Sequence, residues 1–185
     1  KALKYEGKPV ISFGAGEPDF ASPAAAASCA ESAIKEGKTH YTQSNGILEL
    51  REAVASYYSD RFGLDYPADQ VIIGPGAKPL IYGSLASLVD PEDEVLVFSP
   101  AWVSYVEQIR LLDGRASIVD TVTTGNVPLA SKVAEAVTPR TVGMLINTPN
   151  NPTGAVYGEE TLREIAEIAL EHDLWIINDE IYERL

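Results

Sequence analysis

The chain has 185 residues, of which 45% are hydrophobic and 22% charged, a composition typical of a soluble globular domain with a sizeable core. Its 27 acidic and 14 basic residues give a formal net charge of -13; such a surface repels nucleic acid and anionic membranes, so neither is an expected partner. The single cysteine, Cys29, excludes an intrachain disulfide and favours a reducing compartment, the cytoplasm, and no apolar run is long enough to span a bilayer.

Two helices are predicted in the first third of the chain. The first is capped by Ser22, has Pro23 in its first turn and ends at Gly37. The second covers residues 47–62, because its apolar side chains recur with helical spacing, and it ends at Gly63.

From about residue 70, short apolar runs alternate with helical segments. The runs are 71–73, 94–98, 116–119, 142–146 and 174–177, and the helices lie near 79–89, 102–112, 128–137 and 159–171. Nearly continuous β-branched runs indicate strands buried on both faces, so the pattern predicts an α/β fold with a mainly parallel sheet in a three-layer α/β/α arrangement. Ligands bind at the carboxyl ends of such strands.

The first strand end is rich in glycine. The segment 74–79 (Gly-Pro-Gly-Ala-Lys-Pro) precedes a helix, where free backbone N–H groups favour phosphate. An ordinary tight turn explains the glycines equally well. A dinucleotide site is disfavoured, because Pro79 stands where a third glycine belongs and the next strand ends in Phe98-Ser99-Pro100 rather than an acidic residue.

Three later strand ends carry aromatic, amide and acidic side chains. Trp102 could stack on a flat ring or lie in the core. The segment 147–154 holds prolines and asparagines that suit either a turn or a ligand site. The acidic pair Asp179-Glu180 lies at the end of a buried run, and burying an unpaired carboxylate is costly, so a cationic partner would remove the penalty. These positions are the candidate site.

These segments together resemble a known family. The string Asn147-x-Pro-Asn-Asn-Pro-Thr-Gly154, followed by Asp179-Glu-Ile-Tyr182, is similar to class I aminotransferases of pyridoxal-phosphate (PLP) fold type I. The matches cover nearly the whole chain and indicate the branch with the bacterial aspartate aminotransferases. The other matching segments, in order, are 14–20 (Gly-Ala-Gly-Glu-Pro-Asp-Phe), 40–42 (His-Tyr-Thr), 46–51 (Gly-x-x-Glu-Leu-Arg) and 100–105 (Pro-Ala-Trp-Val-Ser-Tyr).

The resemblance implies roles for the residues at the strand ends. Asp179 would pair with the pyridine nitrogen of PLP and keep it protonated, which makes the ring an electron sink. Tyr182 and Asn151 would hydrogen-bond the phenolic oxygen, and Trp102 would stack on the ring. Asp179 and Tyr182 are thus the implied catalytic residues.

The resemblance also implies phosphate, substrate and partner contacts. Gly76-Ala77-Lys78 would bind the phosphate. Gly16 and Asn151 would lie near the substrate's α-carboxylate, with Trp102 beside the substrate. Tyr41 would reach the phosphate of a partner subunit, which implies a homodimer with shared active sites. No metal is expected.

The chain departs from the family pattern at Pro79, at Ala101 and at Ser44-Asn45, which could alter phosphate binding and the substrate pocket. The family's Schiff-base lysine lies in a later Ser-x-Ser-Lys-like segment that these residues do not contain. We therefore expect an N-terminal fragment, without its natural start, that does not transaminate alone. We assign residues 1–45 to an N-terminal segment and part of a small domain, and 46–185 to an incomplete PLP-binding large domain.

The intact protein is accordingly expected to transfer an amino group from an L-amino acid to a 2-oxo acid. Two alternatives stay open. A PLP-dependent lyase or cyclase of the same fold would share Asp179, Tyr182 and Asn151. A non-catalytic nucleotide- or ligand-binding α/β domain would bind no PLP.

Overall fold

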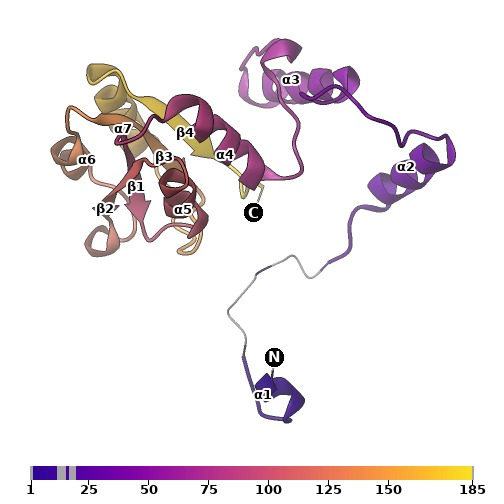
Figure 1. Ribbon diagram of the computed structural model, residues 1–185, viewed down its shortest axis with the longest axis horizontal. Coiled ribbons are helices and arrows are strands. Elements are labelled where there is room, and N and C mark those ends of the chain that lie inside the picture. Colours follow the sequence, from indigo (N-terminus) through magenta and orange to yellow (C-terminus); the bar gives the residue numbers. More distant parts are fainter. Residues whose placement is uncertain (1, 12–15, 17–19, 185) are drawn as a thin grey trace. The chain divides into compact units, whose positions relative to one another are not determined.

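The computed structural model describes residues 2–11, 16 and 20–184. The chain forms two compact units, residues 1–44 and 45–185. The first contains α1 (Ala2–Tyr5) and α2 (Ala24–Lys35) (Figure 1). The predicted helix is confirmed, but Pro23, not Ser22, occupies the N-cap position without a side-chain hydrogen bond. Gly37 follows the helix with φ 76°, a conformation that costs glycine little.

The second unit contains a four-stranded parallel sheet (Figure 1). Its strands are β1 (Glu94–Ser99), β2 (Arg115–Asp120), β3 (Thr141–Asn147) and β4 (Trp175–Asp179). Its helices are α3 (Leu48–Phe62), α4 (Ala77–Leu88), α5 (Ser104–Arg110), α6 (Ala130–Ala136) and α7 (Glu159–Glu171), with 3-10 turns η1 (Ala68–Gln70) and η2 (Val122–Thr124). The parallel α/β prediction is confirmed. None of the described helices is long and apolar enough to cross a membrane.

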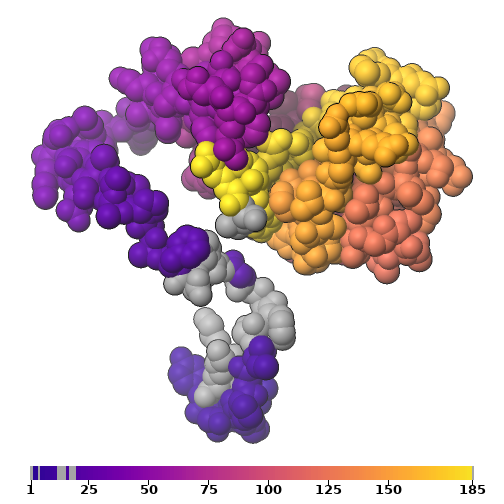
Figure 2. All heavy atoms as spheres, turned by 180° about the vertical axis from the view of Figure 1, so that it is seen from behind, coloured from indigo at the N-terminus to yellow at the C-terminus, as the bar shows by residue number. Residues whose placement is uncertain are grey.

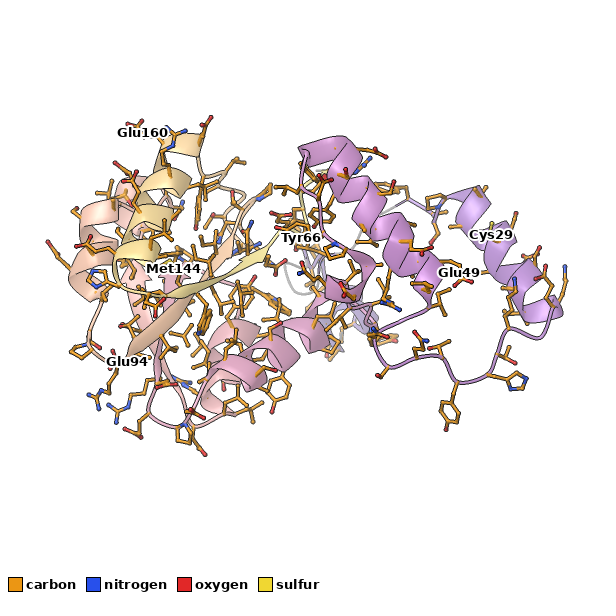
Figure 3. All side chains as sticks on the ribbon, turned by 90° about the horizontal axis from the view of Figure 1, so that it is seen from above. Cys29, Glu49, Tyr66, Glu94, Met144 and Glu160 are labelled. Carbon is orange, nitrogen blue, oxygen red and sulfur yellow. The ribbon has the colours of Figure 1, made fainter. Side chains whose placement is uncertain are left out.

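Alternating side chains of the sheet enter two apolar cores. Val95 and Val97 of β1 pack with side chains of α4 and α5. Leu96 of the same strand packs with α6 and α7, as does Met144 of β3, which is labelled in Figure 3. Because successive strand residues point to opposite faces, the sheet is covered on both sides, as the three-layer prediction requires.

One predicted strand is wrong. Residues 71–73 form no strand among the described residues, and Ile72 is 62% exposed. The Ile73 N–H instead donates to the Asn45 carbonyl at 3.0 Å. A Cβ on Gly46 would lie 2.6 Å from that of Ile73, so a glycine there permits close backbone approach. An apolar run predicts extended backbone but does not supply a neighbouring strand to pair with.

The strand order β2-β1-β3-β4 changes direction between β1 and β3. From β1 the chain goes outward to β2, then returns past β1 to β3 and β4. Such a reversal leaves a crevice at the carboxyl ends of the strands, where α/β proteins bind ligands. Asn147 and Asp179, which end β3 and β4, are register partners. The fold thus brings the candidate residues to one edge of the sheet.

Candidate functional site

Asp179 is the acidic centre of the site. It is 8% exposed at the end of β4. Its Oδ2 accepts a hydrogen bond from the Tyr105 hydroxyl at 2.6 Å, and its Oδ1 accepts one from the Ile181 N–H at 3.2 Å. These are the partners that offset its burial, in place of the cation that the sequence suggested.

Tyr105 stays a hydrogen-bond donor at physiological pH. Its side chain is 2% exposed. Burial first, and then its hydrogen bond to Asp179, raise the pKa of Tyr105 above its ordinary value, since both penalise the phenolate. The site therefore holds one carboxylate with a fixed neutral donor beside it.

Asn147 joins the ends of β3 and β4. Its Nδ2 donates to the Asp179 carbonyl at 3.0 Å, and its Oδ1 accepts from the Asn151 N–H at 2.7 Å. The Asn151 Nδ2 in turn donates to the Tyr182 hydroxyl at 3.2 Å. Since Tyr182 accepts this bond, its own proton is available to another acceptor. Asn151 and Tyr182 both line an open pocket, together with Pro149, Asn150, Pro152, Gly154 and Val156.

The glycine-rich turn lies at the N-terminus of α4, as predicted. Gly76 is the N-cap with φ 93°, and no side chain caps the helix. The N–H groups of Ala77 and Lys78 are therefore in the first turn, where a helix favours anions, whereas Pro79 contributes no donor.

Helix α5 and the residues just before it connect this turn to Asp179. The Lys78 Nζ lies 4.9 Å from the Trp102 ring centroid, in cation–π geometry. The ring of Trp102 meets that of Tyr105 edge-on at 5.3 Å. Gln108 donates from Nε2 to the Lys78 carbonyl at 2.9 Å. A continuous path of contacts thus runs from Lys78 through Tyr105, Asp179 and Asn147 to Tyr182.

The sequence identified most of this cluster but gave no role to three of its residues. Tyr105, Asn147 and Gln108 make the connections between the predicted positions. Their spacing offered one signal, since Trp102, Tyr105 and Gln108 recur every three residues and so share one side of a helical segment.

Gly16 and Tyr41 belong to the unit 1–44, so their predicted contacts with substrate and partner stay predictions. Tyr41 is fully exposed there, and a Cβ on Gly16 would meet nothing within 4 Å. Residues 14, 15 and 17–19 of the predicted motif lie outside the described residues.

Chemically, the cluster suits a flat, anionic, nitrogen-containing ring. The Asp179 carboxylate retains acceptor capacity for a ring N–H, since a carboxylate has about four lone-pair sites. Asn151 and Tyr182 converge as donors for an oxygen. The α4 turn can hold a phosphate, and Trp102 offers an aromatic surface.

Comparison with known proteins shows the family of the chain. A family model described as aminotransferase class I and II matches residues 8–185. Aspartate/prephenate aminotransferase of Thermus thermophilus is 42% identical over 184 residues, covering 99% of this chain and 48% of the relative. The corresponding probable enzyme of Aquifex aeolicus is 44% identical, covering 99% and 47%.

Solved structures give the same result. A double mutant of Thermus thermophilus aspartate aminotransferase superposes with a TM-score of 0.96 at 41% identity, covering all of this chain and 48% of that one. Aspartate aminotransferase of Thermotoga maritima gives 0.95 at 40% identity. The chain spans about half the length of the curated relatives it matches. On its sequence and its fold, the chain belongs to the class I and II aminotransferase family.

Proposed function

We propose that the whole protein containing this chain is a PLP-dependent aminotransferase that moves an amino group from an L-amino acid to a 2-oxo acid. The buried Asp179 carboxylate, held by Tyr105 at the end of β4, is the observation that carries the proposal. The names of the relatives support an acidic amino acid, such as aspartate, as the donor.

Each part of the cluster has a role in this proposal. PLP, when bound, supplies an electron sink for the electrons released at the substrate Cα. Asp179 keeps the pyridine nitrogen protonated. Asn151 and Tyr182 donate to the phenolic oxygen, and Trp102 covers the ring. Asn151 and Trp102 also contact the substrate.

The remaining contacts complete the proposed site. The N–H groups of Ala77 and Lys78, with Gly76 at the N-cap, bind the phosphate. Gly16 approaches the substrate's α-carboxylate. Tyr41 contacts the phosphate bound by a second subunit, in a homodimer located in the cytoplasm. The Schiff-base lysine comes from the part of the protein beyond these residues.

A product assay on the full-length protein tests the proposal. Aspartate and 2-oxoglutarate should give glutamate and oxaloacetate in equal amounts. Release of ammonia or fumarate without glutamate would support the lyase alternative instead. A protein that purifies without the visible absorbance of PLP, and gains none when PLP is added, would support the non-catalytic binding domain.

Removing the Tyr105 hydroxyl should weaken the support of Asp179. We expect Tyr105→Phe to lower kcat about tenfold, which corresponds to one charge-assisted hydrogen bond. Steady-state kinetics measure the effect. Tyr157→Phe is the control, because Tyr157 is also buried, which raises its pKa to about 12. Equal losses in the two variants would contradict a specific role for Tyr105.

Lys78 should contribute charge to the phosphate site. We expect Lys78→Met to weaken PLP binding by the apo-enzyme about tenfold, because Lys78 belongs to the first turn of α4 and its ammonium lies over the Trp102 ring. Equilibrium titration with PLP measures the Kd. Lys132→Met, on a partly exposed side chain whose Nζ donates to the Thr123 hydroxyl at 3.3 Å, should leave it unchanged. A Kd unaffected by Lys78→Met would show that the backbone alone binds the phosphate.

A further inference from the structure

A polar cluster joins α3 to the turn that carries Tyr182. Tyr57 of α3 donates a hydrogen bond to the Glu183 carboxylate and accepts one from an Arg184 guanidinium nitrogen at 2.8 Å. Arg61, one turn further along α3, lies with its Nε 3.2 Å from the same carboxylate. We call Tyr57, Arg61, Glu183 and Arg184 the clasp. In Figure 2 the yellow C-terminal residues lie against the purple residues of α3.

Outside the clasp, helix α3 is attached to the segment that follows it, where the buried Arg51 donates to the Ala68 carbonyl at 2.8 Å. Among the described residues, neither apolar core contains an α3 side chain. Tyr58 adds a long contact from its hydroxyl to Glu180 at 3.5 Å. The guanidinium of Arg184 also lies 5.1 Å from the Tyr57 ring centroid. The contacts between α3 and this turn are therefore polar and aromatic rather than part of a hydrophobic core.

Tyr182 lies in the sequence between two residues, Glu180 and Glu183, whose carboxylates contact tyrosines of α3. Glu180 and Glu183 flank it, and the Glu183 N–H donates to the Glu180 carbonyl at 2.9 Å. On the other side, its hydroxyl meets Asn151 at 3.2 Å. A displacement of the turn would therefore change where the Tyr182 hydroxyl points.

Glu183 of the clasp is held in its carboxylate form. The hydrogen bond from Tyr57 lowers the pKa of Glu183, desolvation opposes it, and the charges of Arg61 and Arg184 lower it further. Hydrogen bonds and positive charges both favour the carboxylate form. The lowered pKa keeps Glu183 available as the acceptor of the Tyr57 hydrogen bond.

We propose that Tyr57 and Glu183 are positioning residues, which hold the Tyr182 turn so that its hydroxyl points to the cofactor's phenolic oxygen. The inference rests on the proposed role of Tyr182. It gives α3, whose side chains lie outside both cores, a part in setting the proton affinity of the bound cofactor.

The test follows the pH-dependent absorbance of PLP bound to the full-length enzyme. A donor to the phenolic oxygen favours its deprotonated form, so Tyr182→Phe should raise the midpoint by about one pH unit, the equivalent of one hydrogen bond. Tyr57→Phe and Glu183→Gln should each raise it by about half a unit. In the Tyr182→Phe background, neither should add a shift, because coupled residues are not additive.

Tyr66→Phe is the matched control. Its ring meets that of Tyr58 edge-on at 6.2 Å, so the variant removes a tyrosine hydroxyl beside α3 while keeping the ring contact and leaving the clasp intact, and it should leave the midpoint unchanged. Thermal unfolding verifies that each variant is folded. If Tyr57→Phe does not fold, Glu183→Gln tests the inference in its place.

The outcomes separate the two proposals. No shift in Tyr182→Phe would overturn the role of Tyr182 and the inference with it. A shift in Tyr182→Phe without one in Tyr57→Phe or Glu183→Gln would overturn the inference alone. Shifts from the clasp variants that persist in the Tyr182→Phe background would also overturn it, since the clasp would then act independently of that hydroxyl.

Discussion

Asp179→Asn should lower kcat of the full-length enzyme by about three orders of magnitude, the scale on which a preorganised electrostatic group acts. Asparagine has nearly the same shape; its Oδ1 can still accept from the Ile181 N–H, and its Nδ2 can donate to the Tyr105 hydroxyl, which can accept as well as donate, so the local structure should persist. What it lacks is the negative charge that keeps a pyridine nitrogen protonated. Steady-state kinetics, with PLP content measured in the same sample, would show the loss.

Asp120→Asn is the matched control. Asp120 ends β2, and its Oδ1 accepts from the Val122 N–H at 2.9 Å, the same local arrangement that Asp179 makes with Ile181 at 3.2 Å. It lies at the sheet edge and is exposed. Comparable losses in both variants would mean that strand-end structure, not charge at the cofactor, explains the effect.

Gly143→Ala should destabilise the protein by about 3 kcal/mol, at the upper end of the usual cost of overpacking. Gly143 pairs with Trp175 in the register of β3 and β4. A Cβ at this position would lie 2.1 Å from Trp175 Cδ2, and the indole cannot move freely because it packs against the core beneath α4 and α5. Denaturant unfolding of the full-length protein measures the change.

Two further variants identify the cause of this loss. Trp175→Leu should restore part of the stability of Gly143→Ala, because it removes the atoms that clash. Gly83→Ala, in α4, would meet nothing within 4 Å and should be neutral or stabilising by up to about 1 kcal/mol. If Gly143→Ala cost no more stability than Gly83→Ala, the result would contradict the close packing of Trp175 against Gly143 of β3.

Local patterns predicted most elements of the fold. Residues 159–171 coincide with α7, because an apolar stripe, two leading glutamates and a following turn all agree. The strand predicted at residues 71–73 is absent. A strand forms only with a neighbouring strand to pair with, and the apolar run alone does not show whether such a neighbour exists. The prediction that Ser22 caps α2 is wrong, because Pro23 occupies the N-cap position.

The site shows the same division. The predicted strand ends placed Asp179, Asn151 and Trp102 at one edge of the sheet, where the structure has them, because parallel strands bring their carboxyl ends together. The partner of Asp179 was not predictable in this way. Tyr105 lies 74 residues earlier in the chain, and only the packing of α5 against the sheet brings its hydroxyl to the carboxylate. PLP itself could be named only from the family resemblance.

The protonation state of the cofactor's ring nitrogen tests the central claim most directly. Nuclear magnetic resonance of the full-length enzyme, loaded with PLP carrying ¹⁵N in the ring, reports whether that nitrogen bears a proton. We predict a protonated nitrogen in the wild type and in Asp120→Asn near neutral pH, and an unprotonated one in Asp179→Asn. An unprotonated nitrogen in the wild type, or a protonated one in Asp179→Asn, would contradict the assignment of Asp179 as its partner.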